Sequence, residues 1–309
     1  MTRAWRAWVA LMDRREPATA LALVRIFTSL VLLGEFVWIY QAGLVEPLWS
    51  TLPSGFATST GTWATSLGAF GVWALATASL VCVLLGLATR VALVAFVLVS
   101  AQLSIIAPDC ESGSDTLIRI VFLVLALSRC NARWSLDAWI ARRIGRPMPT
   151  LIPAWPRYLL LMQLVWVYFS GAQNKSSPNW GPLGGFTALG HALMDPIQGR
   201  FDPSTISALY PLTRVATALT ITFELTAVLY LLWLYYAATR DQPGRLRALV
   251  NRSRVRWIWF ALFVLFEVGI AVGLRLGSFA YVMLALWPLL LLPDEVERVS
   301  RFGRRASTR

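Results

Sequence analysis

Residues 18–40 read ATALALVRIFTSLVLLGEFVWIY, an apolar run in which only Arg25 and Glu35 are charged. A helix needs about 20 predominantly apolar residues to cross the hydrocarbon core of a bilayer. This run is long enough to do so, and it is too long for the apolar core of a cleavable signal peptide. We therefore expect it to remain in the protein as the first membrane-spanning helix.

Runs of the same kind recur along the rest of the chain. The sequence is 57% hydrophobic and only 14% charged over 309 residues, a composition that excludes an ordinary soluble domain. The further runs fall at residues 65–88, 91–108, 115–130, 156–173, 212–238, 256–274 and 277–292. The pattern predicts an all-α polytopic membrane protein, a bundle of about eight transmembrane helices. One membrane domain, residues 18–293, would lie between a basic N-terminal segment, 1–17, and a basic tail, 294–309.

The formal net charge of +12 has two interpretations, nucleic-acid binding or membrane topology. The arginines lie in short clusters between the apolar runs, as the positive-inside rule expects of cytoplasmic loops. With the N-terminus inside, 22 of the 28 basic residues fall on the cytoplasmic side. We therefore predict an integral protein of the plasma (bacterial inner) membrane, with both termini cytoplasmic, membrane lipid as a partner and no nucleic-acid partner.

Three longer connections then lie on the outer face, at residues 41–62, 109–114 and 174–211. The third is too long and too aromatic for a plain linker. Within it Phe186, Leu189 and Leu193 recur at helical spacing, which predicts a short amphipathic helix in the outer interface. This helix carries the sole histidine, His191, which is either a polar tip at headgroup level or a group that contacts substrate.

The three cysteines do not favour a disulfide. Cys82 falls within a predicted span, Cys110 in an outer loop and Cys130 at an inner end, so no two lie on the same side. No spacing typical of a metal site, such as CxxC, occurs in the sequence, and we predict no bound metal.

The stretch YFSGAQNKSSPNW, residues 168–180, contains Lys175, the only lysine in a chain whose other 27 basic residues are arginines. Arginine stays protonated, whereas a desolvated lysine can lose its proton and act as a base or nucleophile. Lys175 is therefore the candidate catalytic residue, with Tyr168, Asn174 and Trp180 as candidate substrate contacts. The alternative is that a coding preference for arginine left a single lysine at the interface.

Ionisable side chains inside the predicted spans form a second group of candidates, because a charge in hydrocarbon costs at least a few kcal/mol and is normally paired or functional. They are Glu35, Asp115, Arg119, Glu224 and Glu267. Asp115 and Arg119 are one helical turn apart and can pair. We expect the four acids to converge on one polar cavity that opens to the outer leaflet, with Lys175 in its wall. The alternative, that each charge only joins helices, is the one we favour for Arg25 and Arg214.

Four short elements resemble the HTTM (horizontally transferred transmembrane) family, whose animal member is the vitamin K-dependent gamma-glutamyl carboxylase. The family's Tyr-Phe-x-x-x-x-x-Lys-x-x-x-x-Trp pattern is matched by Tyr168, Phe169, Lys175 and Trp180. The other three elements are residues 133–137 (RWSLD), 223–226 (FELT) and 277–284 (GSFAYVML). They resemble, in turn, a Trp-Ser-x-Asp element, an acidic element and a Gly-x-Phe-Ser-Tyr-Val-Met-Leu run. All four occur in the family's order and span nearly the whole chain.

The resemblance implies a role for Lys175. In the carboxylase the matched lysine is taken to be the base that deprotonates vitamin K hydroquinone. With O2 this yields a strong base that removes a γ-proton from a peptide glutamate, and the carbanion captures CO2. Carried over, Lys175 would be the first base, and the cofactors would be a reduced quinone of the vitamin K or menaquinone type, O2 and CO2. Ser114 or Asp115, and Glu267, stand where the carboxylase has histidines, and its large lumenal domain has no counterpart in this sequence.

Bacterial relatives of this kind include membrane proteins encoded beside sporulation-delaying-type peptide toxins and needed for toxin maturation. The implied substrate is a secreted peptide or a lipid, and the implied partner a co-encoded maturation protein. The leading hypothesis is a carboxylase-like lyase or a quinol-dependent oxidoreductase that acts at the outer leaflet. The alternatives are a non-catalytic toxin-maturation, immunity or lipid-binding factor, in which buried charges only hold helices together, and a transporter.

Overall fold

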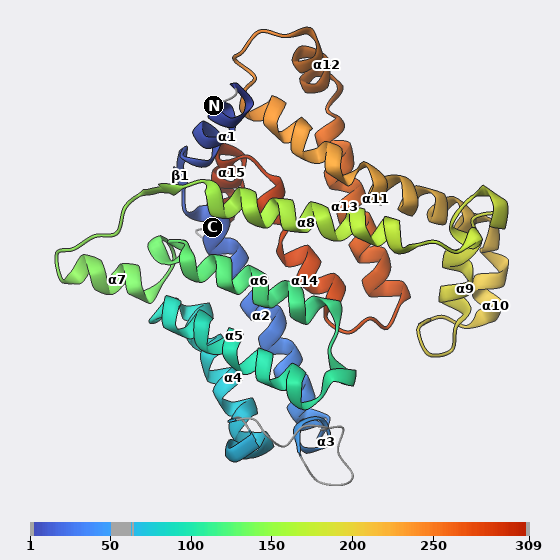
Figure 1. The fold of residues 1–309 in the computed structure, drawn as a ribbon, viewed down its shortest axis with the longest axis horizontal. Coiled ribbons are helices and arrows are strands. Elements are labelled where there is room, and N and C mark those ends of the chain that lie inside the picture. The colour runs from blue at the N-terminus through green and yellow to red at the C-terminus, as the bar shows by residue number, and fades with distance from the viewer. Residues whose placement is uncertain (1–2, 51–62, 64, 307–309) are drawn as a thin grey trace. The chain divides into compact units, whose positions relative to one another are not determined.

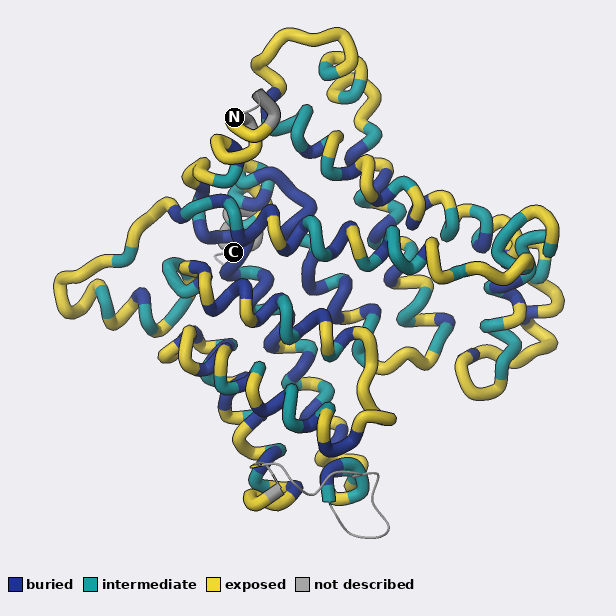
Figure 2. The backbone as a smooth tube through the Cα atoms, viewed as in Figure 1, coloured by how far each residue is buried: buried dark blue, intermediate teal, exposed yellow. Residues whose placement is uncertain are grey.

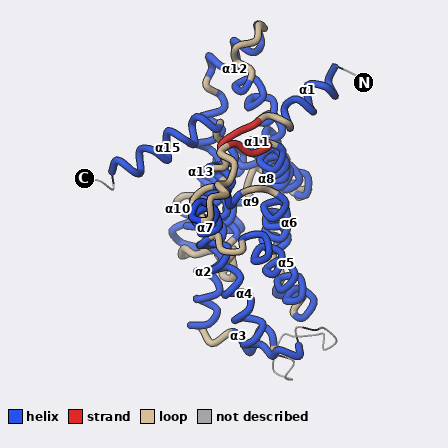
Figure 3. The backbone as a smooth tube through the Cα atoms, turned by 90° about the vertical axis from the view of Figure 1, so that its left-hand side faces the viewer, coloured by secondary structure: helices blue, strands red, loops and turns tan. Residues whose placement is uncertain are grey.

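Most of the chain that the structure describes is helical (Figure 1). The computed structural model describes residues 3–50, 63 and 65–306. Within these ranges the only strands are β1 (Arg15–Pro17) and β2 (Leu151–Pro153), which pair antiparallel and appear as the short red segments of Figure 3. The predicted all-α class is confirmed.

Five helices of the described part are long and apolar enough to cross a membrane. They are α2 (Thr19–Gln41), α4 (Gly68–Leu85), α5 (Thr89–Ile106), α11 (Tyr210–Ala238) and α13 (Val255–Gly273). The shortest has 18 residues, about 27 Å at 1.5 Å per residue, which is close to the hydrocarbon thickness of about 30 Å. These helices coincide with five of the eight predicted spans, so the chain is an all-α membrane protein.

The other three predicted spans are helical but do not meet the same requirements. α6 (Gly113–Leu127) has 15 residues, about 22 Å of helix. α8 (Trp155–Asn174) has 20 residues, but Arg157, Gln163 and Gln173 reduce its apolar character. α14 (Phe279–Ala285) has seven residues and is followed by the 3-10 turn η6 (Trp287–Leu290), where Pro288 lacks the N–H that a continued helix needs.

Contacts divide the chain into two units: residues 1–160 with 285–309, and residues 161–284. In the first unit α2 is the central helix, because half of the 18-residue apolar stretch with which it could cross the membrane is buried. The corresponding share for α4 is 33%. α4 packs on α2, α5 on α4, and α6 on α5. The shorter helices of this unit are α1 (Arg3–Met12), α3 (Val45–Trp49), α7 (Leu136–Arg143) and α15 (Pro293–Ala306).

Arg25 joins three segments of the first unit. Its fully buried guanidinium donates to the carbonyl of Leu84 at 2.9 Å and to that of Trp134 at 2.6 Å. Gly86 ends α4 with φ at +67°, and a Cβ there would lie 2.3 Å from the Cβ of Ser135, so only glycine allows this close approach. Arg25 therefore has the structural role favoured from the sequence, with carbonyl groups as partners.

The second unit contains most of α8, the 3-10 turns η4 (Pro178–Trp180) and η5 (Pro182–Gly184), α11, α13 and most of α14. The helix predicted after Phe186 is α9 (Ala188–Met194), and a further short helix, α10 (Pro203–Ala208), begins at the N-cap Asp202. α12 (Arg245–Ser253) contains no buried residue and is mostly yellow in Figure 2.

Candidate functional site

One face of α8 carries the predicted catalytic stretch. Tyr168, Gly171 and Lys175 follow one another at i, i+3 and i+7, a spacing that places residues on one side of a helix. The helix ends at Asn174, and the Lys175 N–H donates to the carbonyl of Ala172 at 3.2 Å. Lys175 therefore stands at a helix C-terminus, where the free carbonyl groups favour a positive side chain.

Lys175 is paired with Glu224 of α11. Its Nζ lies 2.6 Å from both Oε1 and Oε2 of the carboxylate. The indole ring of Trp180, in η4, lies on the same ammonium, with 5.0 Å from Nζ to the ring centroid, a cation–π distance. The Glu224 side chain is 5% exposed and the Lys175 side chain 21%, so the pair can be reached only from the lysine side.

Gly171 provides the space in which this pair lies. A Cβ at position 171 would be 3.7 Å from Oε1 of Glu224 and 3.8 Å from Nζ of Lys175, which is ordinary van der Waals contact. A methyl group would fit there, whereas a longer side chain would have to displace one partner. Position 171 therefore limits what can approach the ion pair from α8.

A second polar pair lies two helical turns earlier on α8. The Tyr168 hydroxyl donates to Oε1 of Glu267 on α13, and both side chains are buried. Oε2 of Glu267 has no hydrogen-bond partner among the described residues. Aromatic rings surround Tyr168 at centroid distances of 5.1 to 6.2 Å, namely those of Phe223, Trp259, Phe263 and Phe266. A buried acceptor without a donor is costly, so this oxygen marks a place where a proton, a water or a ligand hydroxyl would be stabilised.

The convergence of four acids on one cavity stays a prediction. Glu224 and Glu267 lie in the second unit with Lys175, whereas Glu35, half-buried on α2, and Asp115 on α6 belong to the first unit. The structure gives no arrangement of the two units relative to each other, so a cavity shared by all four acids stays a prediction.

The expected pairing of Asp115 with Arg119 is wrong. Asp115 forms a capping box with Ser112, accepting its backbone N–H at 2.7 Å at the start of α6. Arg119 instead forms an ion pair with Glu111 and donates to the Ser104 hydroxyl at 2.6 Å. Asp115 binds the N-cap residue Ser112 and not Arg119, because a carboxylate at the N3 position is well placed to accept the backbone N–H of the N-cap.

The remaining predicted contacts differ in their surroundings. Trp180 covers Lys175, as described above, but Asn174 is exposed at the end of α8. His191, on α9, is also exposed. Its Nδ1 lies 3.5 Å from Nδ2 of Asn179 in η4, the turn whose N-cap is Ser177. Asn179 was not singled out from the sequence, because an asparagine next to serine and proline is typical of a turn.

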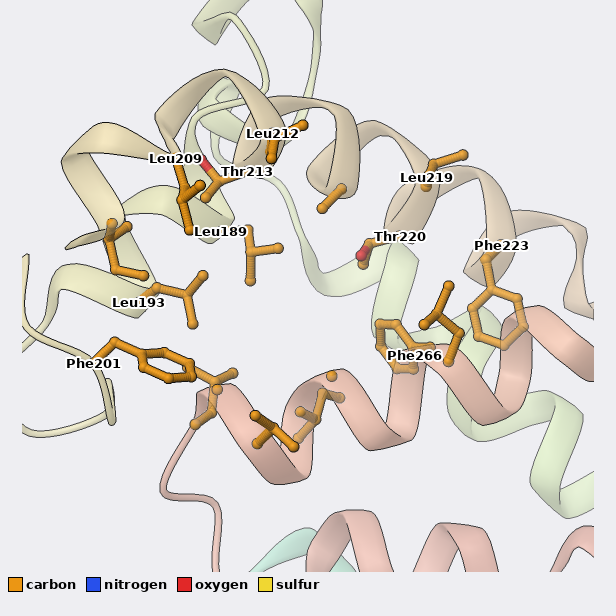
Figure 4. Close-up of a pocket in the computed structure, with 18 of the residues that line it drawn as sticks. Leu189, Leu193, Phe201, Leu209, Leu212, Thr213, Leu219, Thr220, Phe223 and Phe266 are labelled. Atoms are coloured by element: carbon orange, nitrogen blue, oxygen red, sulfur yellow. The ribbon is translucent and has the colours of Figure 1, made fainter.

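An apolar cavity of about 500 Å³ opens between α11 and α13 in the same unit (Figure 4). α9 and α10 close it on one side through residues such as Leu189, Leu193 and Ile206. Phe223 and Phe266 form its far end in Figure 4, and both rings also contact Tyr168. Among the described residues, no group of three or more His, Cys, Asp or Glu side chains could hold a metal ion.

The helices and the buried polar pairs define a class, that of all-α integral membrane proteins with ionisable groups inside the helical bundle. The sequence model of the HTTM domain matches residues 13–242, which is more than half of the chain. The protein therefore belongs to the HTTM domain family, a membrane domain family associated with carboxylase-like proteins. Neither a curated protein nor a solved structure matches the chain significantly.

Proposed function

We propose that this protein is a membrane-embedded, carboxylase-like enzyme that depends on a reduced quinone and modifies a secreted peptide or a lipid. Lys175 is its base. The arginine distribution supports a reaction at the outer leaflet, with eight helical crossings proposed between two cytoplasmic termini in the plasma (bacterial inner) membrane. The resemblance of residues 168–180 to the carboxylase motif supplies the reaction class.

The observation that carries the proposal is the contact of Lys175 with both oxygens of Glu224. Transfer of one proton from Nζ to a carboxylate oxygen leaves a neutral amine and a neutral acid, so the pair can produce a base without changing its net charge. Because Glu224 is buried and Lys175 is partly exposed, a substrate can reach the pair only at Lys175. The amine can then accept a proton from a substrate O–H that approaches Lys175 from the exposed side.

The residues around Lys175 fit a reduced quinone. An aromatic diol requires a hydrogen-bond acceptor for its O–H and flat apolar surfaces for its ring, which the Lys175–Glu224 pair and the Trp180 indole can provide. When bound, such a quinol would supply reducing equivalents for O2 and an ionisable O–H group. Lys175 would hold the proton that leaves this O–H, the anionic oxygen so formed would balance the ammonium, and Glu224 would keep the proton that Lys175 gave up.

A second candidate function is a non-catalytic lipid-binding or toxin-maturation factor. The observation in its favour is the apolar cavity between α11 and α13, which no charged residue among the described ones lines. In this alternative the Lys175–Glu224 pair only joins α8 to α11.

The decisive experiment measures O2 uptake by the purified protein in lipid vesicles that contain menaquinol. The enzyme hypothesis predicts quinol-dependent O2 uptake by the wild type and a loss of that uptake in Lys175→Arg, with incorporation of labelled bicarbonate when the peptide encoded beside the protein is added. Equal, background uptake by the wild type and Lys175→Arg would instead favour the non-catalytic factor.

A further inference from the structure

The cavity between α11 and α13 is an elongated groove with the length of one membrane leaflet. Its lining residues run from Leu212 to Phe223 on α11 and from Leu262 to Gly273 on α13. Each run covers eleven residue steps, about 16 Å of helix at 1.5 Å per residue. Half of a hydrocarbon core of about 30 Å is about 15 Å. The groove therefore extends from the ends of the two helices to about the middle of the membrane.

The inner end of this groove is closed by aromatic rings. Phe223 and Phe266 lie there with ring centroids 5.2 Å apart (Figure 4). Behind them both rings pack on Tyr168. Neither Lys175 nor Glu224 lines the groove, so it is distinct from the candidate catalytic pair. An acyl chain that enters the groove meets these rings near its inner end, where Leu262 of α13 lies one helical turn beyond Phe266.

The walls of the groove match a hydrocarbon chain. Apart from glycine and three threonines, its lining side chains are aliphatic or aromatic. The hydroxyl of one threonine, Thr213, already donates to the carbonyl of Tyr210 in its own helix at 2.8 Å. Gly269 widens the groove, because a Cβ built there meets no atom within 4 Å.

Two arginines flank the outer end of the groove. Phe201 and Leu274 line it, and Arg200 and Arg275 are their neighbours in the chain. The bridge between Gly199 and Leu274 holds these segments together. The two arginine side chains are exposed, and each donates to one carbonyl at 2.9 Å, so most of the five N–H groups of each guanidinium stay free to bind an anion.

The described acidic residues of this region form no ion pair with the two arginines. Oδ1 of Asp195 accepts the N–H of Ile197 at 2.7 Å, and Oδ1 of Asp202 accepts that of Ser204 at 2.8 Å. Among the described residues neither Arg200 nor Arg275 takes part in an ion pair. Their guanidinium groups have the geometry that phosphate oxygens bind best.

We propose that this groove binds one acyl chain of a membrane phospholipid, whose phosphate is held by Arg200 and Arg275. The chain occupies the leaflet-long apolar space down to Phe223 and Phe266. The phosphate lies at the helix ends, where water and headgroups begin. This lipid site is independent of the reaction assigned to Lys175.

The test is native mass spectrometry of the detergent-solubilised protein, titrated with dipalmitoyl phosphatidylglycerol. The wild type should bind one lipid molecule tightly. Gly269→Leu fills the groove from α13 and should weaken this binding at least about tenfold, which corresponds to about 1.4 kcal/mol. The matched control is Gly34→Leu on α2, because a Cβ at Gly34 also meets open space but does not line the groove.

The headgroup is tested with dipalmitoylglycerol, which has the same chains but no phosphate. The wild type should prefer the phospholipid about tenfold or more, whereas the double variant Arg200→Gln/Arg275→Gln should bind both lipids equally. Arg252→Gln, an exposed arginine of α12, is the control. Thr220→Leu fills the groove from α11 and replaces Gly269→Leu in the test if that variant does not fold.

Three results would each overturn the proposal. The first is wild-type phospholipid binding in folded groove-filled variants. The second is an unchanged phosphate preference in the arginine double variant. The third is a co-purified quinone that the groove-filled variants lose, since this would assign the groove to the isoprenoid chain of the quinone.

Discussion

At the scale of single residues, the Lys175–Glu224 contact predicts opposite outcomes for two substitutions. Lys175→Arg keeps a positive charge that can bind both carboxylate oxygens, but guanidinium does not release a proton. We expect its thermal stability in detergent to stay near that of the wild type, while its activity falls by about 10²–10⁴-fold, the usual cost of a lost general base. Quinol-dependent O2 uptake and thermal unfolding of the same sample provide the measurements.

Lys175→Met separates structure from chemistry at the same position. It leaves the Glu224 carboxylate, 5% exposed, without its partner. Removing one member of a buried ion pair costs roughly 3–5 kcal/mol, which we discount because Lys175 is partly exposed, so a clear fall in unfolding temperature is expected. Full activity of Lys175→Arg together with an unstable Lys175→Met would show that the lysine only joins α8 to α11.

Tyr168 and Glu267 give a second prediction at this scale. Tyr168→Phe removes the only described donor to a fully buried carboxyl group and should lower the free energy of unfolding by roughly 1–3 kcal/mol. Tyr168→Phe combined with Glu267→Leu removes both polar groups and should recover much of this loss. A double-mutant cycle on unfolding in mixed micelles measures the coupling, and strictly additive effects would contradict a direct hydrogen bond.

A site residue could be predicted where its type stands out in the sequence, and not where its role depends on how the chain packs. Lys175 stood out because it is the only lysine, and Glu224 and Glu267 because they interrupt apolar runs. Gly171 could not be singled out, since only the packed structure shows a Cβ there touching both members of the pair. Glu111 was also missed as the partner of Arg119, because it lies in a loop whose path the sequence does not determine.

At the scale of elements, Asp137 fixes the turn between α4 and α5. Its carboxylate accepts the backbone N–H groups of Ala88 at 2.8 Å and Thr89 at 3.0 Å, and the amide of Asn131 at 2.9 Å. Partial burial acts to raise the pKa of Asp137, but these hydrogen bonds, that from Asn131 first, outweigh it and lower the pKa below its ordinary value of 3.8. Its ionised form therefore stabilises the folded state.

This lowered pKa predicts a pH dependence with a definite sign. Because the folded state holds the carboxylate ionised, its stabilisation is complete above the unfolded value and is lost as pH falls through the lower, folded value. Asp137→Asn should be less stable than the wild type at neutral pH, by about 1 kcal/mol for a partly exposed cap. The difference should begin to shrink as pH falls below 3.8 and should vanish only below the lower pKa of the folded state. Asp241→Asn, on an exposed loop, is the control, and a difference independent of pH would contradict this role.

The helices themselves were predicted more completely than their roles in the membrane. α2, α4, α5, α11 and α13 follow directly from apolar runs that are long enough to cross a membrane. α14 did not, because the run 277–292 is apolar throughout, while Pro288 and the turn η6 end the regular helix early. α10 was missed since its six residues are too few to show a helical period, although the N-cap Asp202 before Pro203 is a recognisable start signal.

At the scale of the whole molecule, the arginine distribution predicts an orientation that can be tested without knowing the reaction. In this predicted orientation 22 of the 28 basic residues are inside, α12 would be cytoplasmic, and the 174–211 connection, with Lys175 at its start, would face outward. We expect a cysteine introduced at Ser177, which is exposed, to react with an impermeant maleimide added to intact cells. A cysteine at Arg247 of α12 should react only after the cells are opened. Both variants need a background in which Cys110, the exposed native cysteine, is replaced by serine.

Labelling of the Arg247 position from outside, with protection at Ser177, would invert the topology. It would also place the Lys175–Glu224 pair on the cytoplasmic side, where a secreted peptide could meet it only before export.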